Sequence, residues 1–239
     1  RVEIFPLLRE RQPVAHPEAA RLTARAHFHP FVSWPILAAH AHFLRRRPSL
    51  YLRTLWEVLS GTAGSWNFFV GALGVFPKAV RFALEMQQQG VTHLHAHFAT
   101  HPAVAALVVH RLTGIPFSFT AHGSDLHVRR HFLSRKVQAA AFVVAISEFN
   151  KQVIVEECGA WAADKVHVVH CGVDPGYFAP PPARPAGGRL RILCVASYEE
   201  VKGHRYLLEA CRLLQERGID FECHLVGDGP RRAAVAAQI

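Results

Sequence analysis

The chain has 239 residues, half of them hydrophobic, and a formal net charge of +9. This length and composition exclude a disordered chain and allow one large domain or two smaller ones. Its five cysteines form no CxxC pair, which argues against a zinc ribbon or a thioredoxin-type site and favours reduced thiols in a cytosolic setting. The basic charge favours anionic partners, among them nucleic acid, phosphate-bearing substrates and acidic lipids.

The chain is mainly helical in pattern up to Gly90. A short strand is predicted at residues 2–5. Apolar spacing, with prolines near the helix starts and Gly90 as a final cap, predicts helices at residues 18–28, 34–47, 50–59 and 77–89.

Residues 55–76 come closest to a membrane span. Glu57, Asn67 and four glycines interrupt this stretch, so we expect packed helices there instead. Just before it, the triplet Arg45-Arg46-Arg47 is either a solvated helix end or a contact for lipid phosphates or an anionic substrate.

From residue 91 onward, strands and helices alternate. Strands are predicted at residues 91–97, 117–121, 142–146 and 166–170. Helices are predicted between them at residues 101–112, 130–139 and 148–158, with Gly114 and Ser147 as caps. Strands separated by helices of about ten residues imply a parallel sheet that is covered on both faces.

Residues 179–189 are rich in proline and glycine and predict an interdomain linker. A second alternating series follows, with predicted elements at residues 190–195, 203–217 and 221–226. We therefore expect a first domain at residues 1–180, a linker at 181–188 and a second domain at 189–239. Two strands are a poor independent core, so we expect the second domain to be incomplete here.

Three histidines, His93, His95 and His97, alternate along one predicted strand and therefore share a face of the sheet. No matching cluster of carboxylates or cysteines accompanies them. We therefore expect hydrogen-bonded rings at a strand end in preference to a metal site.

The predicted strand at residues 117–121 runs directly into His122-Gly123-Ser124-Asp125. In an open parallel sheet, ligands bind beyond the carboxyl ends of the strands. The segment is either part of a ligand site or a turn that needs a flexible glycine and capping side chains.

Two loops in the second domain have the same placement after a strand. The first contains Ser197 and ends in Lys202 at a loop-to-helix junction, which suits a phosphate. The second is Gly227-Asp228-Gly229-Pro230, whose glycines permit a ligand to approach the backbone closely. Two such loops in succession favour nucleotide-diphosphate binding over ordinary strand-to-helix turns, although the P-loop pattern is absent.

The chain from residue 91 to its end resembles the family 4 glycosyltransferases, which are retaining enzymes of the GT-B fold. The resemblance rests on six motifs in the family's order, namely HLHAHF at 93–98, FTAHGSD at 119–125, VVAISEFNK at 143–151, CGVDPGYF at 171–178, VASYEEVKG at 195–203 and LVGDGP at 225–230. It implies an α/β fold with two Rossmann-like, parallel-sheet domains that face each other across a cleft. The His-rich strand and the basic first part of the chain are most similar to bacterial enzymes that build exopolysaccharide or colanic-acid-type repeat units.

The resemblance also assigns roles to residues. His122 matches the histidine at the donor sugar, and Lys202 matches the lysine that binds the donor diphosphate and stabilises the charge on the leaving group. Both are the expected catalytic residues. The nucleotide-side residues are Ser197, Gly227, Asp228 and Gly229, and those lining the cleft near the acceptor are His97, Gly123, Ser124, Asp125 and Ser147. The family needs no metal and no cofactor beyond the nucleotide sugar.

Three departures from the family pattern stand out. Ser197 occupies the position of an arginine that usually partners the lysine, and Cys171 replaces an asparagine. The glycine-rich loop after a first strand and the acidic E-x7-E segment of the second domain are both absent. We therefore expect an internal piece of a longer enzyme that is poorly active by itself.

We expect a hexosyltransferase-type enzyme that transfers sugar from a nucleoside-diphosphate sugar, UDP-linked, to a lipid-linked saccharide in polysaccharide biosynthesis. We place it in the cytoplasm, peripheral on the inner face of an anionic plasma membrane. Two alternatives are a nucleotide-sugar epimerase of the same fold and a non-catalytic protein that binds nucleotide sugars or glycans. Nucleic acid is not an expected partner, because no basic–aromatic module is present.

Overall fold

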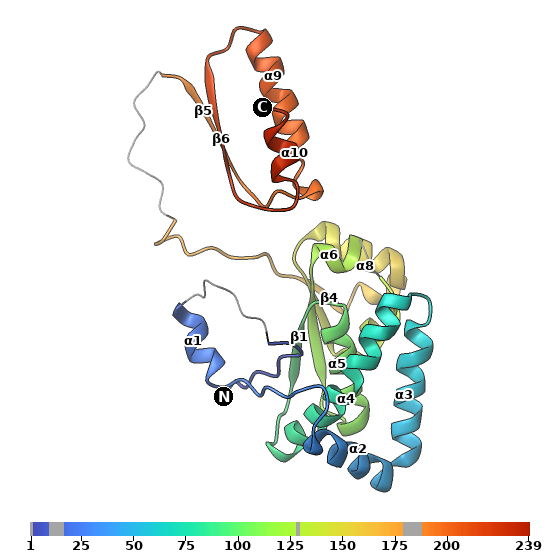
Figure 1. Ribbon diagram of the computed structural model, residues 1–239. Helices are drawn as coiled ribbons and strands as arrows, with labels where there is room; N and C mark the ends of the chain where they lie inside the picture. Colours follow the sequence, from blue (N-terminus) through green and yellow to red (C-terminus); the bar gives the residue numbers. More distant parts are fainter. Residues whose placement is uncertain (1, 10–16, 128–129, 179–187) are drawn as a thin grey trace. The chain divides into compact units, whose positions relative to one another are not determined.

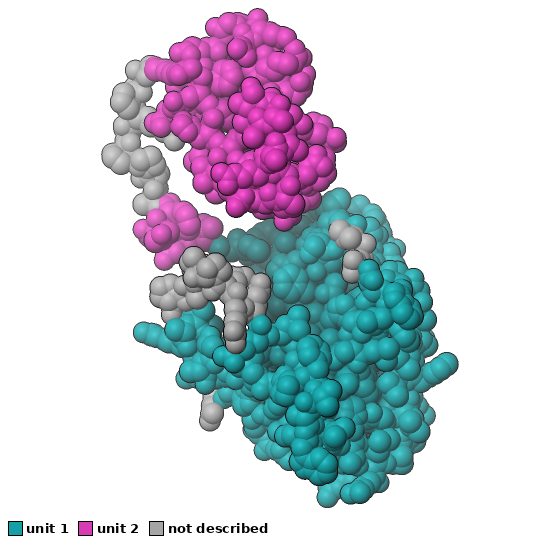
Figure 2. Space-filling view, viewed as in Figure 1, with its two compact units in different colours: residues 1–172 teal, residues 173–239 magenta. Residues whose placement is uncertain are grey.

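Figure 1 shows the computed structural model, which describes residues 2–9, 17–127, 130–178 and 188–239. The chain forms two compact units, unit 1 at residues 1–172 and unit 2 at residues 173–239, which are coloured separately in Figure 2. Each unit contains a parallel sheet and helices, which confirms the predicted α/β class. Most of the predicted linker at 181–188 lies outside the described residues, so the domain boundaries stay a prediction.

Unit 1 is built on a four-stranded parallel sheet in the order β1-β2-β3-β4. The strands are β1 (Leu94–His97), β2 (Phe117–Ala121), β3 (Phe142–Ala145) and β4 (Val166–Val168). The connecting helices are α5 (His101–Thr113), α6 (Gly123–His127), α7 (Leu133–Ala139), α8 (Glu148–Cys158) and the short η1 (Ala160–Ala162). Both predicted caps are confirmed: Gly114 ends α5 with φ +80°, and Ser147 Oγ accepts a hydrogen bond from Asn150 N at the start of α8.

The crossover helices α5, α7 and α8 pack on one face of this sheet. This follows from the strand order, because right-handed crossovers between successive neighbours place every helix on the same side. The opposite face carries His93, His95 and His97, whose side chains are exposed. Helices were expected on both faces of the sheet. Within the described residues, the crossover helices cover one face only.

Four helices precede the sheet in the sequence: α1 (Pro17–Thr23), α2 (Trp34–Arg46), α3 (Pro48–Thr62) and α4 (Trp66–Gln88). The prediction that a helix begins at Pro77 is wrong, because α4 runs through that residue from an N-cap at Ser65. Burial of apolar side chains on both sides of Pro77 outweighs the one hydrogen bond that proline cannot make. The strand predicted at residues 2–5 is also wrong, because only Ile4 pairs, in a single bridge with Ala26.

Helix α4 is the central helix of unit 1. It packs against α2, α3 and α5, and it contributes Phe68, Phe76, Phe82 and Met86 to the core. Among the described helices, only α4 has the length and hydropathy of a membrane span, and 44% of its apolar window is buried inside the unit. Its packing agrees with the predicted role of a core helix.

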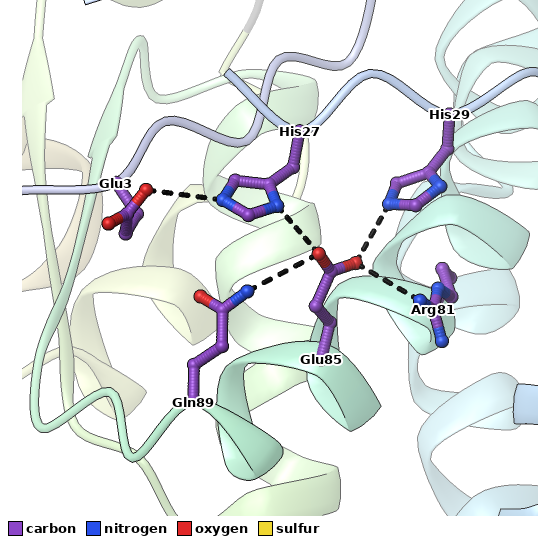
Figure 3. A network of polar contacts seen from close by, with 6 residues as sticks. All are labelled: Glu3, His27, His29, Arg81, Glu85 and Gln89. Atoms are coloured by element: carbon purple, nitrogen blue, oxygen red, sulfur yellow. Dashed lines mark hydrogen bonds and ion pairs between the residues drawn. The ribbon is translucent and has the colours of Figure 1, made fainter. Parts of the chain in front are cut away.

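Glu85 of α4 holds the N-terminal segment of unit 1 onto the helical core (Figure 3). One carboxylate oxygen lies 2.6 Å from His27 Nδ1, and the other lies 2.8 Å from His29 Nε2. Arg81 and Gln89 also contact this carboxylate, at 3.4 Å each. The Glu85 side chain is only 12% exposed, so each partner depends on a nearly buried acceptor.

Glu85→Ala is expected to lower the free energy of unfolding of unit 1 by about 2–4 kcal/mol, because several part-buried donors lose their acceptor. All four tryptophans lie in unit 1, so urea unfolding followed by tryptophan fluorescence reports on this unit. Glu156→Ala, at an exposed site on α8, serves as the matched control. An unchanged unfolding midpoint for Glu85→Ala would contradict the assignment.

Unit 2 contains two parallel strands, β5 (Leu190–Val195) and β6 (Phe221–Val226). The chain between them forms a short 3-10 turn, η2 (Glu200–Lys202), and the helix α9 (His204–Glu216). A last short helix, α10 (Arg232–Ala236), follows β6. The strand–helix–strand order predicted for this part of the chain is confirmed.

Candidate active site

The carboxyl edge of the unit 1 sheet brings three of the predicted site residues to neighbouring strand ends. His97 ends β1 and pairs with Thr120 of β2, so His122 follows two residues beyond that pair. Ala121 pairs with Ala145 of β3, which places Ser147 just beyond the end of the third strand. The His97 and His122 rings lie 6.1 Å apart, centre to centre. The sequence therefore placed these residues at a common edge correctly, whereas their contacts with a substrate stay a prediction.

Asp125 has a different role from the one predicted. The segment after β2 is the short helix α6, and the Asp125 side chain within it is buried, with 3% of the residue exposed. Its Oδ2 accepts hydrogen bonds from Ala99 N at 2.7 Å and from His122 N at 3.0 Å. Asp125 thus ties the loop after β1 to the loop after β2, and its carboxylate does not line an open cleft. Gly123 and Ser124 start the same helix.

Lys136 of α7 lies under the same loops and was missed by the sequence analysis. The residue is 1% exposed, and Nζ donates to Ala99 O at 2.5 Å and to His131 O at 3.1 Å. Burial lowers the pKa of Lys136 to about 7, and the nearby Asp125 opposes this shift. The sequence does indicate this burial, because Lys136 lies on the apolar stripe of α7 together with Leu133 and Val137.

The buried Lys136 makes the free energy of unfolding of unit 1 depend on pH. Between pH 7 and the ordinary lysine pKa of 10.5, the unfolded chain binds the proton and the folded chain does not. Stability therefore rises with pH over this window, by about 2 kcal/mol from pH 7.5 to 9. Urea unfolding of the wild type and of Lys136→Met at both pH values tests this. The rise is expected in the wild type only, and equal slopes for both proteins would refute it.

His93, just before β1, and His95 within it are hydrogen-bonded to the next strand, as predicted. His93 Nε2 and His95 Nδ1 both lie within 2.8 Å of Ser118 Oγ, and His95 Nε2 lies 2.9 Å from Thr120 Oγ1. Burial, followed by the neighbouring His97 and His93, lowers the pKa of His95. Within the described residues, no group of three or more His, Cys, Asp or Glu side chains is arranged to hold a metal ion.

In unit 2, the loops after β5 and β6 run side by side. Ala196 N donates to Val226 O at 3.0 Å, and Tyr198 N donates to Asp228 O at 2.9 Å. A Cβ at Gly227 would lie 2.0 Å from Ala196 O, and φ is +152° at that glycine. The glycine at 227 is therefore required by the adjacent backbone, a reason the sequence analysis did not foresee.

Gly229 is also required by the neighbouring backbone, because a Cβ added at this position would lie 2.8 Å from the backbone of Tyr198. The paired loops hold Ser197 and Asp228 at the carboxyl edge of the unit 2 sheet, and Asp228 Oδ1 accepts from Gly229 N at 2.8 Å. Contacts between a nucleotide and the four predicted residues, Ser197, Gly227, Asp228 and Gly229, stay a prediction.

Lys202 is the last residue of η2, two residues before α9 begins, and its side chain has no competing partner among the described residues. Arg205 and Arg231 both pair with Glu200, at 3.7 and 3.0 Å. Across the described residues, the Lys202 side chain is exposed and has neither a hydrogen bond nor an ion pair. Gly203 N and Tyr206 N already donate to backbone oxygens, so the first-turn N–H groups available to an anion are those of His204 and Arg205.

Parallel α/β units with polar loops beyond the strand ends define a Rossmann-like protein. Residues 14–177 match the model of Glycosyltransferase Family 4, and the chain belongs to this family. A Bacillus subtilis (strain 168) protein named as glycosyltransferase EpsF is 42% identical over 198 residues, which are 73% of this chain and 50% of that protein. An Escherichia coli (strain K12) protein named as colanic acid biosynthesis glycosyltransferase WcaL is 39% identical over 67 residues, 28% of this chain and 16% of that protein.

Among solved structures, the catalytic domain of starch synthase IV from Arabidopsis thaliana, bound to ADP and acarbose, superposes with a TM-score of 0.50. The match covers 70% of this chain and 48% of that one at 12% identity, and it supports the predicted GT-B class of fold. The chain thus spans half or less of the length of each of these relatives.

Proposed function

We propose that this chain is part of an enzyme that transfers a sugar from a UDP-linked donor to a lipid-linked saccharide in exopolysaccharide assembly, with retention of configuration. In this reaction the bond from the anomeric carbon to the diphosphate breaks, and the diphosphate leaves with the bonding electron pair. The acceptor hydroxyl oxygen forms the new bond and loses its proton. The names of EpsF and WcaL support glycosyl transfer and polysaccharide assembly.

The observation that carries the proposal is the unpaired Lys202 beside the first turn of α9. A diphosphate leaving group gains negative charge as its bond to the sugar breaks, and a fixed cation stabilises that charge. The backbone N–H groups of α9 add the positive end of a helix dipole. We propose that these groups supply the charge that a metal supplies in other transferases, so that the reaction needs no metal ion.

In unit 1, His122 and His97 are the groups proposed to contact the saccharides. Both rings lie at the carboxyl edge of the sheet, where ligands of parallel α/β proteins bind. Imidazole nitrogens donate or accept hydrogen bonds, so the two rings suit sugar hydroxyls. Ser147 and Ser124 provide hydroxyl groups near the same edge.

The test is an incubation of the full-length enzyme that contains this chain with UDP-glucose, UDP-galactose, ADP-glucose or GDP-mannose and short-chain alkyl glycosides as acceptors. Mass spectrometry detects the product, NMR assigns its anomeric configuration, and a parallel arm contains EDTA. We expect a retained linkage from a UDP-sugar, unaffected by EDTA. Absence of transfer and of nucleotide release with every donor would refute the proposal, and tight UDP binding without turnover would identify a binding protein instead.

The outer faces of α2 and α3 favour a membrane surface as the place of this reaction. Both helices pack against α4, and they leave Trp34 (78%), Trp56 (70%) and Leu52 (55%) exposed. Arg45-Arg46-Arg47 lies between them and is exposed, and the one acidic residue of the two helices, Glu57, is held by Arg111. Aromatic side chains beside arginines suit the interface of an anionic bilayer. We therefore propose peripheral attachment at the cytoplasmic face of the plasma membrane.

Vesicle binding tests this surface. We expect the protein to co-sediment with phosphatidylglycerol-containing vesicles and not with neutral phosphatidylcholine vesicles. The triple substitution of Arg45, Arg46 and Arg47 by Gln should weaken binding about a hundredfold, at about 1 kcal/mol per residue. A control triple of the same charge change is Arg191→Gln, Arg212→Gln and Arg217→Gln in unit 2. Equal weakening by both triples would mean that only net charge matters.

A further inference from the structure

Phe98 combines an exposed ring with a strained backbone. Among the described residues, the non-glycine residues with positive φ are Phe98 (+77°) and Phe132 (+62°). Phe132 has a packing reason, because its ring fills the space beside Gly61 in the core. Phe98 is 45% exposed at the end of β1, so core packing does not explain its conformation. A glycine would fit this backbone without strain.

Three residues hold Phe98 in this conformation, and we call them the Phe98 clamp: Thr120, Asp125 and Lys136. Phe98 N donates to Thr120 O at 3.0 Å. The next residue is held at both of its backbone polar groups, because Ala99 N donates to Asp125 Oδ2 and Ala99 O accepts from Lys136 Nζ. Strained residues persist where the surroundings over-determine them, and such residues gather at functional sites.

The clamp also fixes the distance between Phe98 and His122. The same Asp125 oxygen that holds Ala99 N accepts a hydrogen bond from His122 N at 3.0 Å. The Phe98 and His122 rings lie 4.8 Å apart at an angle of 40°. The buried Asp125 carboxylate holds both loops, and the Phe98 ring and the His122 imidazole therefore lie side by side.

This pair matches the chemistry of a pyranose ring. One face of a pyranose presents C–H groups, which pack against the electron-rich face of an aromatic ring, and its edge presents hydroxyls that hydrogen-bond to imidazole. We propose that Phe98 is a saccharide-contacting residue, whose ring packs on one pyranose face while His122 bonds the hydroxyls. The class of ligand, a saccharide, rests on the glycosyl transfer proposed above.

Saturation-transfer NMR tests this contact without requiring turnover. The probes are methyl β-D-glucopyranoside, methyl β-D-galactopyranoside and UDP-glucose, each at millimolar concentration. We expect transfer to pyranose C–H protons in the wild type and a loss of about fivefold or more in Phe98→Ala and Phe98→Gly. Phe98→Tyr should retain the contact. A loss seen with the methyl glycosides assigns an acceptor sugar, and one seen only in the glucose signals of UDP-glucose assigns the donor.

The glycine variant separates a ligand role from a structural one. Phe98→Gly relieves the backbone strain, so its urea midpoint should equal or exceed that of the wild type while saccharide contact falls. Trp161→Ala, equally exposed at 45% in η1, is the control that should keep the contact. Wild-type saturation transfer in Phe98→Gly, a lowered urea midpoint in that variant, or no saturation transfer to any probe would overturn the proposal. Phe98-dependent contact in a protein with no transferase activity would instead overturn the proposed function alone.

Discussion

Lys202→Ala is expected to lower the turnover number for sugar transfer by about 10²–10³-fold. The lysine is exposed beside the first turn of α9, and Glu200 already holds the nearby Arg205 and Arg231. By the family resemblance, Ser197 occupies the position of an arginine that usually partners the lysine, so we expect little else near Lys202 to compensate for its loss. Because the charge on the diphosphate grows as the bond breaks, the effect should fall on kcat more than on KM.

The assay is the rate of nucleoside-diphosphate release in the presence of acceptor, with Lys202→Arg and Arg212→Ala measured in parallel. Lys202→Arg keeps the charge and should retain part of the activity, since the guanidinium has a different shape and reach. Arg212→Ala removes a charge from the adjacent helix α9, at a residue paired with Glu209 and Glu216, and should leave kcat unchanged. Activity of Lys202→Ala within about threefold of wild type would place diphosphate binding elsewhere.

The regular part of the fold was predictable because its signals are local. Strands β1 to β6 and helices α5, α8 and α9 follow from apolar periodicity and caps such as Gly114 and Ser147. Helix α4 was divided wrongly at Pro77, because a proline normally stops a helix and only tertiary packing reveals that it does not. The bridge at Ile4 depends likewise on a partner far along the chain.

The candidate site divides in the same way. The family resemblance assigned His97, His122 and Ser147 to one site, and the three residues lie at one edge because the carboxyl ends of parallel strands meet there. Asp125 was misjudged because its partners, Ala99 N and Lys136, come from another loop and from α7 and cannot be read from the neighbouring sequence. The same holds for Gly227, whose close neighbour is backbone from another loop.

Asp125→Ala is expected to be the most destabilising of the single substitutions considered, lowering the unfolding free energy of unit 1 by about 3–5 kcal/mol. It leaves the buried N–H group of Ala99 and the part-buried N–H group of His122 without an acceptor. It also removes the charge that favours a protonated Lys136 in a site that is otherwise unfavourable for a cation. Tryptophan fluorescence during urea unfolding measures the loss in unit 1.

Three further variants show which of these effects dominates. Asp125→Asn keeps one acceptor oxygen and should cost less, whereas Asp164→Ala, exposed in the same unit, should cost nothing measurable. If the buried charge dominates, the double variant Asp125→Ala/Lys136→Met should be more stable than Asp125→Ala, because no lysine then remains unpaired. If the lost backbone hydrogen bonds dominate, the double variant recovers nothing. Wild-type stability in Asp125→Ala itself would show that the loops after β1 and β2 hold their positions without this carboxylate.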